Sequence, residues 1–186
     1  MRIENICKSY GGHVVLDHVS FTAQRGVTCL MAPSGTGKTT LLRILLGLET
    51  ADSGTITDPP ARWGVMFQED RLIPRLSALE NLRFAIGPAL DEKKALALLA
   101  RLGLGGEGEK PIREYSGGMK RRLALARAIL APAEALALDE PFTGLDEGNK
   151  DACIAAIREA AGEKPVLLVT HDVADAEALG ANIVRI

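Results

Sequence analysis

A phosphate-binding loop is the strongest chemical signal in the chain. Residues 32–40, APSGTGKTT, fit the spacing G-x-x-x-x-G-K-[ST] at Gly37, Lys38 and Thr39, with Ala32 in place of the first glycine. Glycines let backbone amides turn toward a phosphate, the lysine neutralises its oxygens, and the following hydroxyl suits Mg²⁺. The residues expected to bind phosphate are Pro33, Ser34, Gly35, Thr36, Gly37, Lys38, Thr39 and Thr40. An ordinary glycine-rich turn is disfavoured, because a strand pattern precedes this loop and a helical pattern follows it.

Two acidic residues end a second apolar run. In ALALDEPF, residues 135–142, Asp139 and Glu140 follow aliphatic residues that predict a buried strand. Ligands of open parallel sheets bind beyond the carboxyl ends of the strands, so we expect both carboxylates beside the phosphate loop. Asp139 then suits Mg²⁺, and Glu140 suits polarisation of an attacking water. An isolated Asp-Glu pair would be read as a solvated strand end; the phosphate loop favours the catalytic interpretation.

His171, in LLVTHD, follows a third apolar run. An isolated histidine is more often structural than catalytic. Its position at a strand end nevertheless places it at the same expected sheet edge as Asp139, where it could contact the terminal phosphate of a nucleotide.

The segments around these residues alternate between strand and helix patterns. Short apolar runs predict strands, and helical spacing predicts helices. The strands are expected near 1–6 and at 27–31, 63–67, 135–139, 166–170 and 183–186, and the helices at 39–48, 77–104, 118–131, 150–161 and 174–179. Ser77 and Glu80 fit the S-x-x-E pattern of a capping box. Alternation of this kind indicates an α/β fold with a parallel sheet, whereas period-two alternation in 14–23 predicts a sheet with one solvated face.

The composition indicates one globular domain. The chain has 186 residues, of which 47% are hydrophobic and 25% are charged, with a formal net charge of −2. These values exclude a disordered chain and argue against a nucleic-acid partner bound by electrostatics. Cys7, Cys29 and Cys153 lack the spacing of a disulfide framework or a zinc site. The sequence shows neither a secretory signal nor an apolar run of spanning length, so we expect a cytoplasmic protein.

The motifs taken together resemble an ABC-type ATPase. After the phosphate loop come Gln68 in VMFQED, SGGMKRR beginning at Ser116, LALDEPF, the GLD of residues 144–146, and VTHD. SGGMKRR is the most specific of them, since other phosphate-loop NTPases lack such a segment between the two Walker motifs. This segment and FQEDRLIPRLSALENL are similar to the ATPases of nitrate, sulfonate and taurine importers.

The resemblance implies an α/β fold of the P-loop NTPase type. Its parallel-sheet core would carry a small N-terminal antiparallel β region over about residues 1–30 and an inserted helical lobe over about 70–115, all within a single domain of residues 1–186.

The resemblance also implies roles for further residues. Tyr10 would stack on adenine, with a turn tyrosine as the alternative, and Gln68 would touch Mg²⁺ and the attacking water. Ser116, Gly117 and Gly118 would bind the γ-phosphate of ATP held by a second copy. Asp146 would cross the interface between the copies, with a helix cap as the alternative. The expected catalytic residues are therefore Lys38, Gln68, Glu140 and His171, and the expected Mg²⁺ ligands are Thr39, Gln68 and Asp139.

Two positions depart from the family pattern. Ala32 adds a Cβ where the first glycine is expected, which strains the backbone if φ is positive there. Met119 stands where the signature commonly has Gln, so a polar contact to the partner's nucleotide is lost and dimer closure should weaken.

The resemblance implies the ATP-binding and hydrolysing subunit of an ABC transporter, with motifs that favour an importer. Two copies would hold two Mg-ATP head to tail, and an apolar groove near residues 72–79 would receive separate membrane permease subunits. A substrate-binding protein would deliver the cargo, and the chain would sit on the inner face of the cell membrane. The alternatives are a soluble ABC ATPase that acts on ribosomes or DNA, an accessory subunit with weak turnover and, least favoured, a nucleoside-phosphate kinase.

Overall fold

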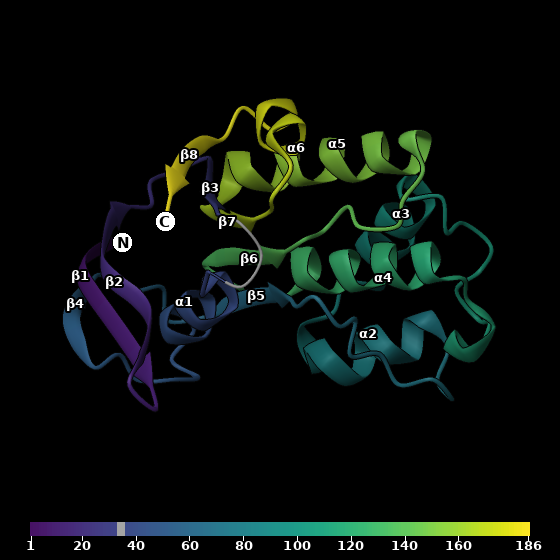
Figure 1. Ribbon diagram of the computed structural model, residues 1–186. Helices are drawn as coiled ribbons and strands as arrows, with labels where there is room; N and C mark the ends of the chain where they lie inside the picture. Colours follow the sequence, from purple (N-terminus) through teal and green to yellow (C-terminus); the bar gives the residue numbers. More distant parts are fainter. Residues whose placement is uncertain (33–35) are drawn as a thin grey trace.

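The computed structural model describes residues 1–32 and 36–186, and this part of the chain contains two β-sheets (Figure 1). A parallel sheet has the strand order β5-β6-β7-β3-β8, and an antiparallel sheet has the order β2-β1-β4. The parallel strands are β3 (Val27–Met31), β5 (Trp63–Met66), β6 (Ala135–Asp139), β7 (Val166–Val169) and β8 (Asn182–Arg185). The antiparallel strands are β1 (Arg2–Tyr10), β2 (His13–Thr22) and β4 (Ser53–Thr57). The expected α/β fold with a parallel sheet is confirmed.

Helices follow or connect most of the strands. They are α1 (Lys38–Leu45), α2 (Ala78–Ile86), α3 (Glu92–Arg101), α4 (Gly117–Leu130), α5 (Glu147–Glu163) and α6 (Val173–Ala178), with short 3₁₀ turns η1 (Gly87–Ala89) and η2 (Ile112–Glu114). Within the described residues, these helices are all too short or too polar to cross a membrane. In Figure 1, α1 lies near the antiparallel sheet, while α2 and α3 lie at the opposite end of the molecule.

The central strands of the parallel sheet, β6, β7 and β3, are buried on both faces, and alternate residues of a strand enter different hydrophobic cores. On one face, Leu136 and Leu168 belong to a core that includes buried residues of α4 and α5. On the other face, Ala137 and Leu167 pack with buried residues of α1 and the antiparallel sheet. Successive side chains of a strand point to opposite faces, so continuous apolar runs such as 135–138 have both faces covered.

The segment 70–115 contains α2, η1, α3 and η2. The predicted capping box opens α2: Ser77 Oγ accepts from the Glu80 amide at 3.3 Å, and the Glu80 carboxylate accepts from the Ser77 amide at 2.7 Å. The predicted helical stretch is divided at Gly87 and Pro88, where the chain forms η1. Buried leucines of α2 and α3 share a core with α4, so this segment packs on the helix that begins at the SGGM motif.

The antiparallel sheet contains a strand that the sequence did not reveal. β4 pairs with β1, with Ile3 opposite Ile56 and Arg2 opposite Thr57. Its sequence, SGTIT, has one large apolar residue, so neither alternation nor an apolar run marks it as a strand. The N-terminal antiparallel β region was expected to cover about residues 1–30. Val27–Met31, at its end, belongs to the parallel sheet.

We predict that Gly64→Ala destabilises the fold, because β5 and α4 approach closely at this position. A Cβ on Gly64 would lie 2.2 Å from the Ala128 carbonyl oxygen and 2.7 Å from Leu136 Cδ2. Overpacking of this kind costs about 1–3 kcal/mol, which urea unfolding would measure. Gly162→Ala in α5 is the control: its Cβ meets nothing within 4 Å, and alanine should stabilise the helix by up to about 1 kcal/mol. Equal midpoints for the two variants would contradict the close approach.

Candidate functional site

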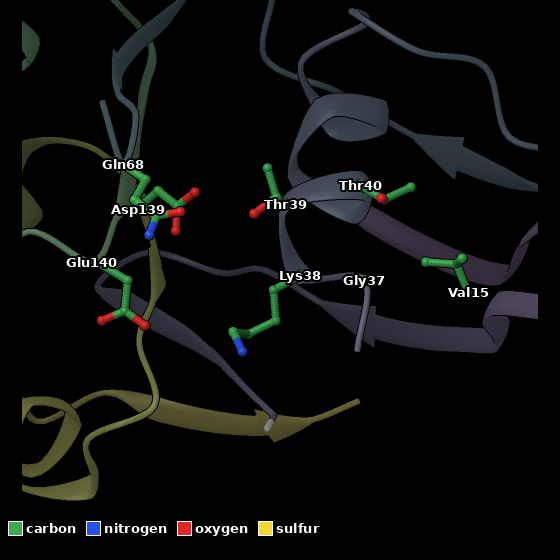
Figure 2. A pocket seen from close by; sticks show the side chains of 8 residues that line it. All are labelled: Val15, Gly37, Lys38, Thr39, Thr40, Gln68, Asp139 and Glu140. Atoms are coloured by element: carbon green, nitrogen blue, oxygen red, sulfur yellow. The ribbon is translucent and has the colours of Figure 1, made fainter. Parts of the chain in front are cut away.

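A polar cavity of about 360 Å³ opens at the carboxyl end of β6, next to the start of α1. It is lined by Val15, Gly37, Lys38, Thr39, Thr40, Gln68, Asp139 and Glu140 (Figure 2). All except Val15 are predicted site residues, contributed by three separate stretches of sequence. Side chains at the start of α1 face the two acids and Gln68 across the cavity (Figure 2). Pro33, Ser34 and Gly35 lie outside the described residues, and Thr36 lines a neighbouring hollow along β2.

Gly37 joins the loop to α1 in a conformation that favours glycine. Its φ is 87°, and a Cβ would lie 2.7 Å from Val15 Cγ1 and 2.8 Å from the Val15 carbonyl oxygen. The first turn of α1 contains no acidic side chain. Its amides can therefore bind an anion without competition from a neighbouring carboxylate.

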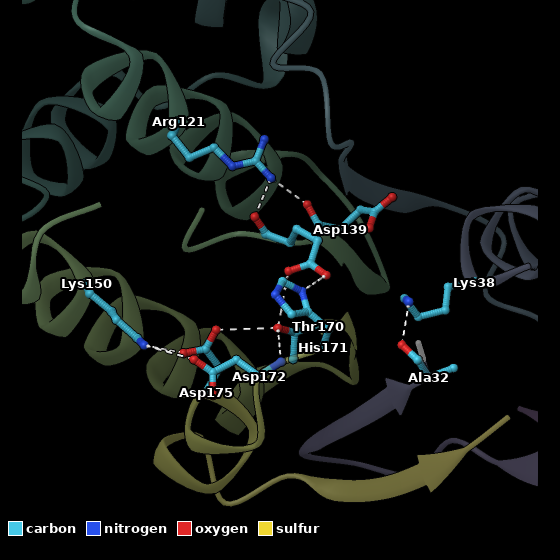
Figure 3. Close-up of polar contacts among 10 residues, drawn as sticks. Ala32, Lys38, Arg121, Asp139, Lys150, Thr170, His171, Asp172 and Asp175 are labelled. Atoms are coloured by element: carbon cyan, nitrogen blue, oxygen red, sulfur yellow. Dashed lines mark hydrogen bonds and ion pairs between the residues drawn. The ribbon is translucent and has the colours of Figure 1, made fainter. Parts of the chain in front are cut away.

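Lys38 is buried, and its Nζ donates a 2.6 Å hydrogen bond to the Ala32 carbonyl oxygen (Figure 3). This bond places the ammonium group at the end of β3, between α1 and Glu140 (Figures 2 and 3). The cation is thus positioned to neutralise phosphate oxygens in the cavity.

Asp139 is 3% exposed, and its pKa is raised because burial penalises the carboxylate and Glu140 adds a like charge. Arg121, Lys38 and the Thr39 hydroxyl oppose this shift. Asp139 Oδ2 is buried and has no hydrogen-bond partner among the described residues. An unpaired carboxylate oxygen facing a threonine hydroxyl and a glutamine fits a hard divalent cation such as Mg²⁺.

Glu140 and His171 form a hydrogen-bonded pair at the same edge of the sheet (Figure 3). His171 Nδ1 lies 2.8 Å from Glu140 Oε1, and the Thr170 hydroxyl donates to Glu140 Oε2 at 3.3 Å. The pKa of His171 is raised, mainly by its hydrogen bond to Glu140. The Glu140 backbone has a φ of 49°, in the left-handed region that non-glycine residues rarely adopt. Backbone strain and a paired carboxylate occur together at this residue.

Arg121 reaches this edge from α4. The sequence pattern did not indicate that it belongs to the site. Its guanidinium donates to the Gln68 carbonyl oxygen at 2.8 Å and to the Asp139 carbonyl oxygen at 2.6 Å. The only signal was the basic pair that ends SGGMKRR, and sequence spacing does not tell which way either arginine points.

Tyr10 ends β1 outside the residues that line the cavity. Its side chain is partly exposed, and its hydroxyl donates to the Glu49 carboxylate, which raises the Tyr10 pKa. The Lys8 ammonium lies 5.2 Å from the ring centroid. Thr40, which lines the cavity, acts on the Tyr10 pKa in the opposite direction.

The signature segment lies away from the phosphate-loop cavity. Gly117 and Gly118 line a separate hollow with Arg121, Thr143 and Gly144, and Gln68 lines both hollows. Within the chain, Ser116 Oγ caps α4 by accepting from the Met119 amide at 3.2 Å.

Asp146 caps α5, which is the alternative that the sequence left open. Its carboxylate accepts from the Asn149 amide at 2.9 Å and from the Asn149 side chain at 2.6 Å. These bonds lower the pKa of Asp146.

A glycine-lysine-threonine loop leading from β3 into a helix, with an acidic pair at the carboxyl end of another strand of the same parallel sheet, defines a P-loop NTPase. The family model described as ABC transporter matches residues 16–143, and the chain belongs to this family. It is therefore an ATP-binding cassette with ATPase activity.

Two relatives and one solved structure show how close the similarity is. An aliphatic sulfonates import ATP-binding protein of Nocardia farcinica is 41% identical over 186 residues, covering 98% of this chain and 76% of the relative. The Nod factor export ATP-binding protein I of Cupriavidus metallidurans is 38% identical, covering 96% of this chain and 65% of the relative. A dimeric bacterial ABC transporter cassette superposes with a TM-score of 0.85 at 26% identity, covering 100% of this chain and 93% of the other. The resemblance to sulfonate-importer ATPases is confirmed.

We predict that the raised pKa of His171 depends on Glu140. Glu140→Gln should lower the pKa toward the ordinary histidine value of about 6.5, because the charged hydrogen-bond partner is lost. Lys38→Ala should raise it, because the nearby lysine charge lowers the His171 pKa. The pair of His171 and Glu140 contributes its full stabilisation to the folded protein at pH values below the ordinary histidine pKa. This contribution is lost as the pH rises through the higher pKa that His171 has in the folded protein.

Imidazole NMR titration without Mg²⁺ or nucleotide would measure these values, with His171→Gln used to assign the resonance. An identical His171 pKa in the parent and in Glu140→Gln would contradict the pairing.

Proposed function

We propose that two copies of this chain form the ATP-driven engine of an importer, with ATP binding closing the pair and hydrolysis reopening it. The observation that carries this proposal is the separation of two hollows on one chain. One hollow contains Lys38 and Glu140, and the other contains Gly117 and Gly118. A second copy placed head to tail would bring its signature hollow to the nucleotide held at Lys38. The solved dimeric cassette supports this arrangement.

The phosphate-loop cavity would bind the nucleotide phosphates. Lys38 and the α1 amides would hold the phosphate oxygens, with Pro33, Ser34, Gly35, Thr36 and Thr40 completing the loop. Tyr10 would contact the adenine ring. Asp139, Thr39 and Gln68 would hold Mg²⁺, which when bound neutralises charge on the phosphates.

Glu140 and His171 would act on the attacking water and the terminal phosphate. The Glu140 carboxylate would accept a hydrogen bond from the water and orient it, while Gln68 would help to position it. His171 is tied to Glu140 at 2.8 Å, so its imidazole is placed to contact the phosphate end of the cavity. Attack by water on the terminal phosphorus breaks its bond to the leaving ADP oxygen and yields phosphate.

The signature residues would act across the dimer. Ser116, Gly117 and Gly118 begin α4, so its N-terminal amides and the serine hydroxyl can face an anion from the partner. Asp146 would lie at the interface between the copies while it caps α5. Met119 offers no polar side chain there, and we expect a weaker closure than glutamine would give.

The segment 70–115 would act as a helical lobe that docks to membrane permease subunits at the inner face of the membrane. Its surface exposes Phe84 on α2, with 75% of the residue accessible, and Leu96 on α3, with 50% accessible. The import relative supports uptake. A substrate-binding protein would then deliver the cargo outside the membrane, and the partner chains would select it. Because another relative is an export ATP-binding protein, the direction of transport must be measured separately.

We predict that Glu140→Gln abolishes ATP hydrolysis and traps an ATP-bound dimer. Removing a general base lowers turnover by about 100-fold or more, while the phosphate contacts remain. Phosphate release would report the rate, and light scattering with and without ATP would report the dimer. Glu163→Gln, at the exposed end of α5, is the charge-matched control. Unchanged turnover in Glu140→Gln would remove Glu140 from its proposed role.

We predict that Lys38→Ala weakens ATP binding at least about tenfold, since a charge-assisted hydrogen bond to phosphate is lost. Calorimetric titration with ATP would measure the dissociation constant. Lys93→Ala on the exposed face of α3 removes the same charge away from the cavity and should leave affinity unchanged. Equal affinity in the two variants would overturn the phosphate-loop assignment.

A further inference from the structure

Arg121 extends from α4 toward Asp139 (Figure 3), and its side chain is 5% exposed. Its guanidinium contacts two segments that carry proposed catalytic residues. One segment follows β5 and carries Gln68, and the other ends β6 and carries Asp139 and Glu140. These segments are distant in sequence, and one guanidinium group contacts both.

The Nη1 group of Arg121 binds the segment that follows β5. Nη1 donates to the carbonyl oxygens of Phe67 at 3.0 Å and Gln68 at 2.8 Å, and to Asp70 Oδ1 at 3.0 Å. Gln68 therefore has its backbone held on one side while its side chain lines the nucleotide cavity.

The Nη2 group of Arg121 binds the backbone of the acidic pair, Asp139 and Glu140. Nη2 donates to the Asp139 carbonyl oxygen at 2.6 Å and to the Glu140 carbonyl oxygen. Because Glu140 has a φ of 49°, its peptide group needs a partner that holds this rarely populated conformation. The bond to Nη2 supplies one, and the orientation of the Glu140 carboxylate depends on the same backbone.

Burying the charged Arg121 side chain costs folding free energy. Its Nε is buried without a hydrogen-bond partner among the described residues, and Asp70 is the carboxylate it pairs with. Removing a guanidinium from water is repaid only where its donors are well satisfied. What this arginine provides is a rigid fork that bonds two segments at a fixed separation, which a lysine cannot do.

We propose that Arg121 is a positioning residue, which fixes Glu140 and the Gln68 segment to the helix that begins at the signature. Ser116 caps the same helix, so a contact made there by a partner's nucleotide bears on a rigid element that is hydrogen-bonded to the backbone of Glu140. The positioning of Glu140 follows from this chain alone. The link to a partner's nucleotide rests on the dimer proposed above.

Arg122 provides a matched control within α4. It is 7% exposed, and its guanidinium donates to the carbonyl oxygens of Leu102 and of Gly118, the latter at 3.2 Å. Its substitution also removes a buried guanidinium from this helix, but it breaks no bond to Gln68, Asp139 or Glu140.

The test compares Arg121→Lys and Arg121→Gln with Arg122→Gln. We expect both Arg121 variants to lower kcat for Mg-ATP by about tenfold or more, because small displacements of catalytic groups are costly, with KM changed less than about twofold. Arg122→Gln should lower the melting temperature comparably and leave kcat within about twofold. Wild-type kcat in Arg121→Lys, or equal losses of kcat in the Arg121 and Arg122 variants, would overturn the proposal.

The pKa of His171, measured by NMR without nucleotide, provides a second readout that does not need turnover. It should fall in Arg121→Lys, because the displaced Glu140 carboxylate no longer pairs with the imidazole, and stay at the parent value in Arg122→Gln. An unchanged pKa in a folded Arg121→Lys variant would refute the positioning role. A parent that does not hydrolyse ATP would count against the proposed function instead, while leaving this measurement intact.

Discussion

Burial of both faces of the central strands of the parallel sheet is the constraint on which the proposed catalytic arrangement depends. β6 up to Leu138 and the whole of β7 present apolar residues on both faces, and polar residues begin at the carboxyl end of each strand. Because the strands are parallel, these ends lie along one edge. Asp139 thereby faces the start of α1 across the cavity, and His171 lies at the same edge paired with Glu140, although both are far from α1 in sequence.

That edge concentrates groups that are individually unfavourable to bury. Asp139 has a raised pKa and an unpaired oxygen, Glu140 has a left-handed backbone, and Arg121 has an unpaired Nε. Strain and unsatisfied polar atoms of this kind persist only where the surroundings hold them in place, and they are typical of sites that act on a ligand. The hydrophobic cores on either side of the sheet provide that support.

The separation of the two hollows is the basis on which we propose that this ATPase works as a pair. Gln68 borders both hollows, and Arg121 binds its backbone from the helix that carries the signature. The nucleotide cavity and the signature are therefore linked within one chain, even though they would serve different nucleotides. Arg121 makes that link through its hydrogen bonds to the backbone of Gln68 and Asp139.

The sequence by itself determined the elements whose signals are local. The phosphate loop, the capping box of Ser77, the apolar strands and the acidic pair all follow from residue types at short spacing, and most of the residues lining the cavity were predicted from them. Contacts between distant parts of the chain decided that β4 joins β1 and that Arg121 points inward. The physical reason is that a polar strand or a long charged side chain has no intrinsic orientation, and acquires one only from partners distant in the chain.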